Sequence, residues 1–424
     1  MREDTRRWIE GDQAHCWHPF TRQAEWCARG HEPLVLVRGE GSWLWDSEGR
    51  RYLDGNSSIW TNIHGHAHPA INAAIQEQLG KVAHTSFLGF THPLAAELAE
   101  RLCGFFPEKT LERVFFSDDG STAIECALKM AVQYRQQVGQ PARNRFIAFS
   151  NGYHGDTLGA ASLGGVGRFS ERFRSCGYPV HHIGSMDELR DLPAETLAGV
   201  VIEPLIQGVN EMRPWPRGML AALRQWCDVS GVHLILDEVM TGFGRTGAMF
   251  ACQHEDVIPD FLCLAKGLTG GYLPLAATLT TGEIYDAFLG TAERAYYYGH
   301  SYTAYPLGCA AALASLDVFA QEQTLAHLPE KIARLSSGLA DLKSRHSLVH
   351  ETRQCGFIAG IELRRPDGEK FSPSERFGEA ICHAARAHGL LTRPILDTLV
   401  LMPPLSTSLE EIDHALHALD LALK

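Results

Sequence analysis

The middle of the chain alternates short apolar runs with stretches that have helical periodicity. The runs are rich in β-branched and aromatic residues and read RVFF, RFIAFS, GVVIEPL, HLILDEV and FLCLAKG. Apolar runs of this length, separated by helices, are typical of parallel strands that are buried on both faces. We therefore predict an α/β fold whose large central domain, residues 67–311, is built on a mostly parallel sheet.

The two ends of the chain have a different pattern. Residues 35–54 alternate in the manner of a half-exposed hairpin, with turns at Gly39–Gly41 and Ser47–Gly49. After residue 312 come amphipathic helices, strands in GFIAGIELRR and TLVLMPPL, and a final helix. We predict a smaller α+β domain assembled from both termini, residues 1–66 and 312–424.

Composition and charge narrow the class of protein. The 424 residues are 45% hydrophobic and 21% charged, which is ordinary for a globular protein, and the net charge is −12 without any basic tract. Nucleic acid is therefore not an expected partner, because binding phosphates needs clustered lysine and arginine. No apolar run approaches the roughly 18 residues of a membrane span, and the charged start does not resemble a secretory signal. We expect no membrane association.

The eleven cysteines are scattered and never spaced C-x-x-C. An odd number of thiols inside apolar stretches such as IECALKMA is typical of reduced, packed cysteines. The expected location of the protein is the cytoplasm.

Lys266 is the first candidate for chemistry. It lies in DFLCLAKGLTGGYLPLA and is the only lysine between Lys129 and Lys331. Burying an unpaired charge is costly, so the side chain either extends to water or carries an amine that the protein uses.

A second candidate is the acidic end of HLILDEVMTGFGRTG. Asp237 and Glu238 follow a buried strand, where α/β folds bind ligands, although an exposed acidic strand end has the same sequence. The glycines of GFGRTG match a dinucleotide fingerprint, but they do not leave the strand directly and no good helix follows. A nicotinamide-dependent dehydrogenase is therefore only a rival interpretation.

The segment VFFSDDGSTAIECALKMA predicts an anion site. A strand leads into Gly120 and Ser121, and Thr122-x-x-Glu125 has the pattern of a capping box. Free backbone N–H groups at the start of the helix would meet a phosphate there. A plain capped helix is the equally good alternative.

Aromatic and histidine motifs complete the set of candidates. Tyr153 and His154 lie between glycines in SNGYHGDTLGA, which suits a flat stacking platform or simply a turn. His64, His66 and His68 alternate in IHGHAHPAI, but no acidic or cysteine partner has the spacing of a metal ligand. We expect turn and capping roles for these histidines and no metal.

These motifs converge on one cofactor. A phosphate site, an aromatic platform, a strand-end acid and an isolated lysine together suit pyridoxal 5′-phosphate. The amine would bind the cofactor's aldehyde, and the carboxylate would keep the pyridine nitrogen protonated so that the ring can accept electrons.

At this point the chain resembles a known family, the class III, fold-type I aminotransferases, over nearly its full length. GSTAIECALKMA, GYHGDTLGA, IEPLIQG, LILDEVMTGFGRTG and AKGLTGGYLPLAA carry the resemblance in the order that the family has. The resemblance implies that Lys266 is the Schiff-base residue, that Asp237 is the partner of the pyridine nitrogen and that Tyr153 stacks on the ring. It further implies a homodimer with shared active sites, in which Ser301 reaches the partner's phosphate. The cofactor-binding residues it implies are Gly120, Ser121, Tyr153, His154, Glu203, Asp237, Lys266 and Ser301.

Within the class, other motifs resemble the members that aminate 8-amino-7-oxononanoate to 7,8-diaminononanoate in biotin synthesis. They are CWHPFTRQ, YLDGNSSIWTNIHGHAHP, KVAHTSFLGFTHPLAAELAERL and LTRPILDTLVLMPPL. Arg393 would hold the carboxylate of this substrate as a bidentate clamp, unless it is a solvent-facing surface charge. Trp60, which could equally be a core residue, and Tyr153 would line the alkyl channel. The substrate-binding residues implied are Phe20, Trp60, Tyr153, Asp156 and Arg393.

Two positions leave the amino donor open. Many members have tyrosine at the position of Phe20 and tryptophan at the position of Ile59. S-adenosylmethionine is the usual donor, while HPFT, SSIWTNIHGH and GHSYT resemble a variant that uses lysine. Another class III aminotransferase, acting on ω-amino acids with pyruvate or 2-oxoglutarate, is the nearest alternative function. A non-catalytic cofactor-binding scaffold is also conceivable, but the joint presence of Lys266, Asp237 and Arg393 argues against it.

Overall fold

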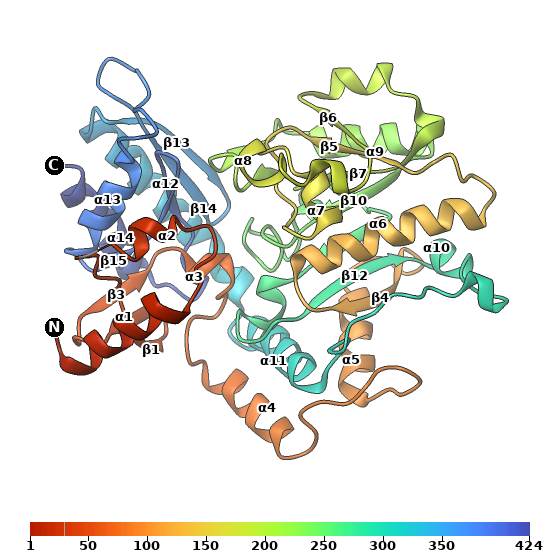
Figure 1. Ribbon diagram of the computed structural model, residues 1–424, viewed down its shortest axis with the longest axis horizontal. Helices are drawn as coiled ribbons and strands as arrows, with labels where there is room; N and C mark the ends of the chain where they lie inside the picture. Colours follow the sequence, from red (N-terminus) through yellow and green to blue (C-terminus); the bar gives the residue numbers. More distant parts are fainter. Residues whose placement is uncertain (29) are drawn as a thin grey trace.

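The computed structural model describes residues 1–28 and 30–424 and has two lobes (Figure 1). The large lobe is built on a seven-stranded sheet of order β4-β12-β11-β10-β7-β5-β6. Strands β10, β11, β7, β5 and β6 pair in parallel, and β12 is antiparallel to both of its neighbours. The strands are β4 Leu111–Ser117, β5 Arg145–Phe149, β6 Val180–Ile183, β7 Leu197–Ile202, β10 His233–Asp237, β11 Phe261–Leu264 and β12 Ala276–Thr281. The predicted mostly parallel sheet is confirmed.

Helices cover the faces of this sheet. Strands β7, β10 and β11 are buried at every position, which explains why their sequences are apolar runs without alternation. The helices of the large lobe are α4 Pro69–Leu79, α5 Pro93–Cys103, α6 Gly120–Gln137, α7 Leu158–Leu163, α8 Gly167–Ser170, α9 Met219–Ser230, α10 Gly282–Asp286 and α11 Pro306–Gln321. A two-stranded ribbon, β8 Ile206–Gln207 and β9 Arg213–Pro214, follows β7.

The small lobe combines both ends of the chain. Strands β1 Leu36–Glu40, β2 Trp43–Asp46 and β3 Arg51–Asp54 form the antiparallel unit expected for residues 35–54, and β15 Leu390–Leu391 adds to it in parallel. A second sheet has the order β13-β14-β17-β16, with β13 Val349–Cys355, β14 Ile358–Leu363, β16 Pro394–Ile395 and β17 Thr398–Leu401. The helices are α1 Glu3–His15, α2 Gln23–Trp26, α3 Ser57–Trp60, α12 Thr324–Arg345, α13 Phe377–Arg386 and α14 Leu409–Ala422.

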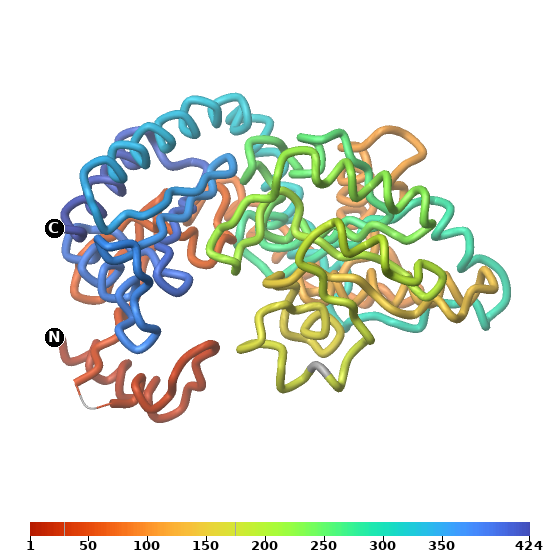
Figure 2. The backbone as a smooth tube through the Cα atoms, turned by 90° about the horizontal axis from the view of Figure 1, so that it is seen from above, coloured from red at the N-terminus to blue at the C-terminus, as the bar shows by residue number. Residues whose placement is uncertain are grey.

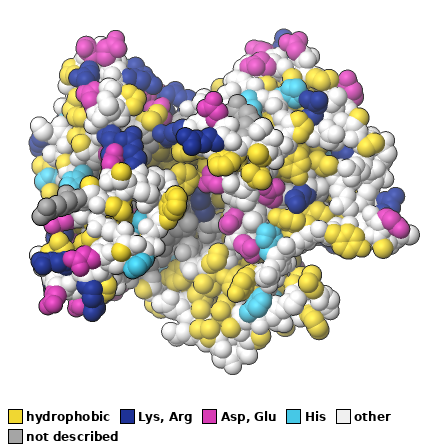
Figure 3. All heavy atoms as spheres, viewed as in Figure 1, with side chains coloured by type: hydrophobic (Ala, Val, Ile, Leu, Met, Phe, Trp, Pro, Cys, Tyr) yellow, Lys and Arg dark blue, Asp and Glu magenta, His cyan; other side chains and the backbone are white. Residues whose placement is uncertain are grey.

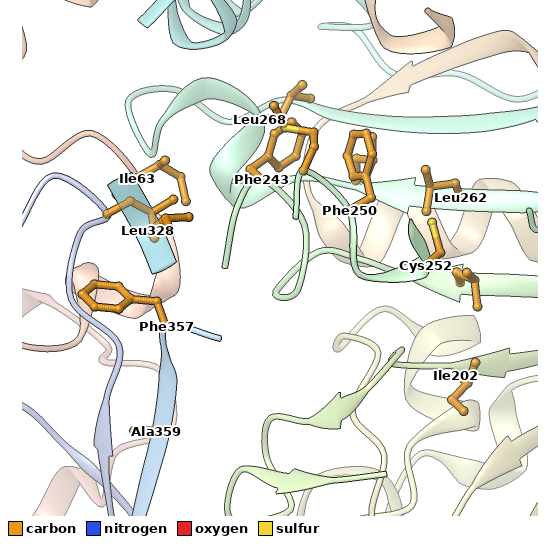
Figure 4. Packing of buried hydrophobic residues seen from close by; sticks show 14 of the residues in the cluster. Ile63, Ile202, Phe243, Phe250, Cys252, Leu262, Leu268, Leu328, Phe357 and Ala359 are labelled. Atoms are coloured by element: carbon orange, nitrogen blue, oxygen red, sulfur yellow. The ribbon is translucent and has the colours of Figure 1, made fainter. Parts of the chain in front are cut away.

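One hydrophobic cluster runs through both lobes. Phe243, Phe250 and Leu268 of the large lobe share it with Leu328 and Phe357, which come from the C-terminal part (Figure 4). All five side chains are buried. The continuous packing fixes the two lobes against each other and thereby fixes the walls of the space between them.

The expected boundary after residue 311 falls inside α11, which continues without a break from Pro306 to Gln321. The three-part division of the chain stays a prediction. Across the described residues, no helix combines the length and apolar character that crossing a bilayer requires.

Candidate active site

A cavity of about 1840 Å³ lies between the lobes, and its opening is visible as a hollow in the surface (Figure 3). It is lined by all of the residues that we expected at a cofactor and substrate site, except Asp156 and Ser301. The residues brought together there are Phe20, Trp60, Gly120, Ser121, Tyr153, His154, Glu203, Asp237, Lys266 and Arg393. The volume exceeds that of an ordinary ligand pocket and has room for a cofactor together with a substrate.

Lys266 lies just after β11 and opens a short 3-10 helix, Lys266–Thr269. Its φ of 44° is in the left-handed region, which is costly for a residue with a side chain. The Nζ atom lies 4.9 Å from the centroid of the Trp60 ring and makes no hydrogen bond or ion pair with any described residue. Desolvation lowers the pKa of Lys266 despite the opposing charges of Asp237 and Glu203. The amine therefore faces the cavity without a polar partner. This is the arrangement expected of a lysine whose amine takes part in chemistry.

Asp237 ends β10 and is buried at one wall of the cavity. Its Oδ2 atom is 2.8 Å from Nδ1 of His154, and its Oδ1 accepts a hydrogen bond from the Val239 N–H at 3.1 Å. Burial disfavours the charged form of His154, but the hydrogen bond and charge of Asp237 outweigh this effect and raise the pKa of His154. The pair therefore holds a hydrogen-bonded carboxylate at the cavity wall.

Glu203 also lines the cavity. Its Oε1 accepts a hydrogen bond from the Tyr153 N–H at 3.1 Å, and its Oε2 accepts one from the Gly208 N–H at 2.9 Å. Desolvation raises the pKa of Glu203 to about 7. The side chain thus holds the backbone of Tyr153 in place.

The segment that we expected to bind phosphate does begin a helix, but its cap differs from the expected one. Helix α6 begins at Gly120, and its N-cap is Asp119, whose side chain accepts from the Thr122 N–H at 2.9 Å. The expected capping box of Thr122 with Glu125 is wrong, because Thr122 is already in the first turn. Glu125 instead accepts a hydrogen bond from the Gly159 N–H at 2.6 Å.

Two glycines are required at this end. A Cβ on Gly120 would lie 2.6 Å from Cγ1 of Val239, and one on Gly155 would lie 2.1 Å from Oγ of Ser121. Gly155 also has a φ of 119°, which a residue with a side chain rarely adopts. The Ser121 Oγ accepts from the Asp156 N–H at 3.1 Å. The backbone is therefore packed closely around the start of α6.

The aromatic wall comes from both lobes. The Tyr153 hydroxyl donates to Oδ2 of Asp156 at 2.6 Å, and desolvation raises the pKa of Tyr153. The rings of Tyr153 and Phe20 both meet Phe169 edge-on, with centroid distances of 5.9 and 5.4 Å. Figure 2 shows the N-terminal segment, in red, reaching from the small lobe towards the large lobe. Phe20 itself has a φ of 51°.

The remaining candidates are placed as follows. Trp60 is only 9% exposed, and its Nε1–H donates to Oδ1 of Asn56 at 2.9 Å while its ring faces Lys266. Arg393, between β15 and β16, is exposed at the cavity, and its guanidinium makes no hydrogen bond or ion pair within the described chain. Ser301 is exposed and does not line the cavity of its own chain.

The histidine and glycine motifs have structural roles. His64, His66 and His68 contact Ser315, Asp54 and Glu322 respectively, at 3.1, 2.9 and 2.9 Å. No group of three or more His, Cys, Asp or Glu residues within the described part of the chain could hold a metal ion.

In GFGRTG, the fully buried Arg245 donates to the carbonyl oxygens of Pro403 at 2.6 Å and Asn62 at 3.2 Å, and so ties the two lobes together. The segment forms turns without a helix.

Some cavity residues were not anticipated from the sequence. Asp119, Arg168, Phe169 and Glu211 also line the cavity. The segment GRFSERFR around Arg168 has no pattern that distinguishes a cavity wall from a charged surface loop. Asp119 could have been found from the aspartate that precedes GSTAIE, since aspartate is a preferred N-cap residue.

The residues present fit pyridoxal 5′-phosphate. An amine without a polar partner faces the cavity, a buried carboxylate lies on one wall, and helix α6 begins at Gly120, where free backbone N–H groups can meet an anion. These are the three groups that the cofactor's aldehyde, pyridine nitrogen and phosphate require.

Comparison with known proteins agrees with this fit. Residues 26–423 match the family model of aminotransferase class III. The adenosylmethionine-8-amino-7-oxononanoate aminotransferase of Geobacter sulfurreducens is 44% identical, covering 98% of this chain and 97% of that protein. The enzyme of the same name from Nitratidesulfovibrio vulgaris is 46% identical, covering 96% of this chain and 79% of that protein.

Solved structures show the same fold. The crystal structure of the Methanocaldococcus jannaschii adenosylmethionine-8-amino-7-oxononanoate aminotransferase superposes with a TM-score of 0.96 at 39% identity, covering 99% of both chains. A PLP-bound amine transaminase from an uncultivated Pseudomonas species superposes with a TM-score of 0.89 at 34% identity, covering 96% of this chain and 98% of the other. The chain therefore belongs to the class III aminotransferases and is a fold-type I aminotransferase that uses pyridoxal 5′-phosphate.

Proposed function

We propose that this enzyme aminates 8-amino-7-oxononanoate to 7,8-diaminononanoate, a step of biotin synthesis. The observation that carries the proposal is Arg393, a cation without a partner among the described residues, on the wall of the cavity that contains Lys266. The acceptor is an alkyl chain with a ketone near one end and a carboxylate at the other. The names of the relatives at 36–46% identity support the same substrate.

Lys266 is the proposed catalytic residue. Bound pyridoxal phosphate supplies an aldehyde that takes up the amino group and a ring that accepts electrons. The Nζ of Lys266 would be the attachment point, and once displaced it would carry the proton from the donor carbon. Its lowered pKa favours the neutral amine that this proton transfer needs.

Asp237 and His154 would act on the opposite side of the site. The Asp237 carboxylate is held in place by His154 at 2.8 Å, and it would be the partner of the ring nitrogen. Gly120 and Ser121, at the start of α6, would hold the phosphate with backbone N–H groups and a hydroxyl.

The alkyl part of the acceptor would lie between aromatic side chains. Trp60 and Tyr153 line the cavity that contains Lys266, and Phe20 lines it from the N-terminal segment. Asp156 accepts the Tyr153 hydroxyl and so orients that ring. The apolar walls exclude water from the chain, and Arg393 fixes its carboxylate end.

The active form is proposed to be a homodimer in the cytoplasm. Leu88, Phe90, Tyr297 and Tyr302 are large apolar side chains that are more than half exposed in the single chain. Such residues are typical of an interface. Ser301, next to Tyr302, would then reach the phosphate of the neighbouring site. All eleven cysteines are free thiols, which suits a reducing compartment.

The test is a comparison of half-reactions by stopped-flow absorbance of the bound cofactor. The aminated enzyme should return to its starting spectrum with 8-amino-7-oxononanoate, and Arg393→Met should raise the KM for this acceptor about 10- to 100-fold. Arg334→Met, which removes an exposed arginine paired with Asp413, is the matched control and should have no effect. Reaction with pyruvate or 2-oxoglutarate but not with the oxononanoate would instead favour an ω-amino acid aminotransferase.

A further inference from the structure

The backbone of Arg393 is joined to the short antiparallel hairpin formed by β16 and β17. The carbonyl oxygen of Arg393 accepts a hydrogen bond from the Val400 N–H at 3.3 Å, and the Thr392 hydroxyl donates to the carbonyl oxygen of Val400. The guanidinium of Arg393 has no such partner within the described chain. Its position in the cavity therefore depends on what holds the hairpin.

A buried junction of hydrogen bonds holds the hairpin against the turn between β8 and β9. Thr398, the first residue of β17, donates its hydroxyl to Oε2 of Glu211 in that turn at 2.9 Å and accepts from Nη2 of Arg353 at 3.2 Å. Nε of Arg353 also donates to the carbonyl oxygen of Glu211 at 3.0 Å. Thr398 and Arg353 are both buried, so these bonds are shielded from water. Three segments of the chain thus meet at one hydroxyl group.

Apolar packing follows the same junction. Glu211 and Met212 both have left-handed backbone, with φ of 58° and 54°, which persists only where the surroundings hold it. Met212 is buried in a small cluster with Ile395 and Val400 of the hairpin and with Trp60. The turn and the hairpin are therefore in direct contact through both polar and apolar side chains.

The ribbon formed by β8 and β9 is fastened at its other end to the inner wall of the cavity. Oε2 of Glu203 accepts from the Gly208 N–H at 2.9 Å, and Oε1 accepts from the Tyr153 N–H at 3.1 Å. The carbonyl oxygen of Gly208 in turn accepts from the Met212 N–H at 3.1 Å. A continuous series of hydrogen bonds thus connects Tyr153, which would stack on the cofactor, with the turn that holds the hairpin of Arg393.

We propose that Glu211 and Thr398 are positioning residues that fix the distance between Arg393 and the cofactor, and thereby the length of the acceptor that the enzyme prefers. This inference rests on the proposed function and deepens it. The ketone of the acceptor must reach the cofactor while its carboxylate reaches Arg393. Because hydrogen bonds weaken steeply when their geometry is lost, a fixed guanidinium discriminates against a chain of the wrong length and a loose one does not.

The main test is Thr398→Val, which removes the hydroxyl and nearly keeps the shape of the side chain. Thr398 does not line the cavity, so the substitution can act on the acceptor only through its neighbours. Thr407→Val is the matched control, because Thr407 is an equally buried threonine outside the cavity lining, and its hydroxyl is paired with Ser42 at 3.0 Å.

The assay follows the acceptor half-reaction by stopped-flow absorbance of enzyme reconstituted with pyridoxamine 5′-phosphate, so that no donor is needed. Three acceptors are compared: 8-amino-7-oxononanoate, 7-amino-6-oxooctanoate, which is one methylene shorter, and 2-aminooctan-3-one, which has no carboxylate. Thr398→Val should raise the apparent Kd for the first about three- to tenfold. Its preference for the first over the shorter acceptor should fall at least about threefold. Reaction with the acceptor that lacks a carboxylate should not change, and Thr407→Val should resemble the wild type with all three.

Two substitutions of Glu211 test the same bond from its other side. Glu211→Gln keeps an oxygen that accepts from the Thr398 hydroxyl and should stay close to the wild type. Glu211→Ala removes this oxygen and should reproduce the effect of Thr398→Val. Combining Glu211→Ala with Thr398→Val should add little, because both remove the same interaction.

Several results would overturn the inference. An unchanged affinity and length preference in folded Thr398→Val would do so, as would an equal loss with all three acceptors, which would indicate a general disturbance of the cavity. If Thr398→Val does not fold, equal behaviour of Glu211→Gln and Glu211→Ala would decide against it. A wild-type enzyme that does not react with 8-amino-7-oxononanoate would instead refute the proposed function, and the inference with it.

Discussion

The buried ion network beneath Glu211 gives a prediction whose size follows from the structure. Arg353 is 3% exposed and forms ion pairs with Glu351 and Glu362, and Arg364 Nε donates to Oε1 of Glu362 at 2.8 Å. Burial alone would raise the pKa of Glu362. The hydrogen bonds and charges of Arg353 and Arg364 outweigh this effect and lower the pKa from 4.5 to about 2. The folded protein therefore stabilises the ionised form of Glu362.

The stabilisation can be converted to free energy. Since each tenfold change in proton affinity is worth about 1.4 kcal/mol, the ionised Glu362 adds about 3 kcal/mol to the free energy of unfolding at pH 7. Glu362→Gln should remove about this amount, because the neutral amide leaves Arg353 buried without its main partner. Glu375→Gln breaks an ion pair with Arg365 that is largely exposed and should change stability little.

The pH dependence has a definite sign. A carboxyl group whose pKa is lowered on folding stabilises the protein above the pKa of its unfolded form, near 4.5, and loses this effect as the pH falls towards 2. The difference between wild type and Glu362→Gln should therefore be roughly 1 kcal/mol smaller at pH 3.5 than at pH 7.

Urea denaturation of the cofactor-saturated enzyme, followed by circular dichroism at both pH values, measures this difference. The reasoning would be refuted if Glu362→Gln lowered the free energy of unfolding by less than about 1 kcal/mol at pH 7, or if it lowered this free energy more in acid than at pH 7.

Three further predictions concern the cavity. Lys266→Ala should abolish transamination with every donor, and turnover in a cofactor-saturated assay would contradict the role of its amine. Gly155→Ala places a Cβ 2.1 Å from Oγ of Ser121, so it should weaken cofactor binding at least about tenfold in an absorbance titration, with unchanged affinity counting against the tight turn. Tyr153→Phe removes the hydrogen bond to Asp156 and should lower kcat/KM for the acceptor about five- to tenfold, as steady-state kinetics would show. An unchanged value would mean that the ring alone positions the substrate.

The sequence predicted the central sheet because its strands are buried on both faces. Runs such as HLILD are apolar throughout and have no helical periodicity. The acids at the end of this run mark the edge of the sheet where ligands bind. Lys266 and Asp237 could be chosen for the same reason, since a charge is rare in such surroundings. The cap of α6 was misplaced because Asp119 and Thr122 both suit an N-cap, and only the backbone shows which residue starts the helix.

The sequence by itself therefore determined the class of fold, the cofactor and the residues that local chemistry singles out. The tertiary structure decided which distant side chains share the cavity. Phe20, Arg168, Glu211 and Arg393 come from four separate segments, and no local pattern relates them. Phe357 and Leu328 pack against the large lobe, and this packing fixes the positions of these four segments around the cavity. Charges interact through space, so which charged side chains meet in the cavity depends on that packing and not on their place in the chain.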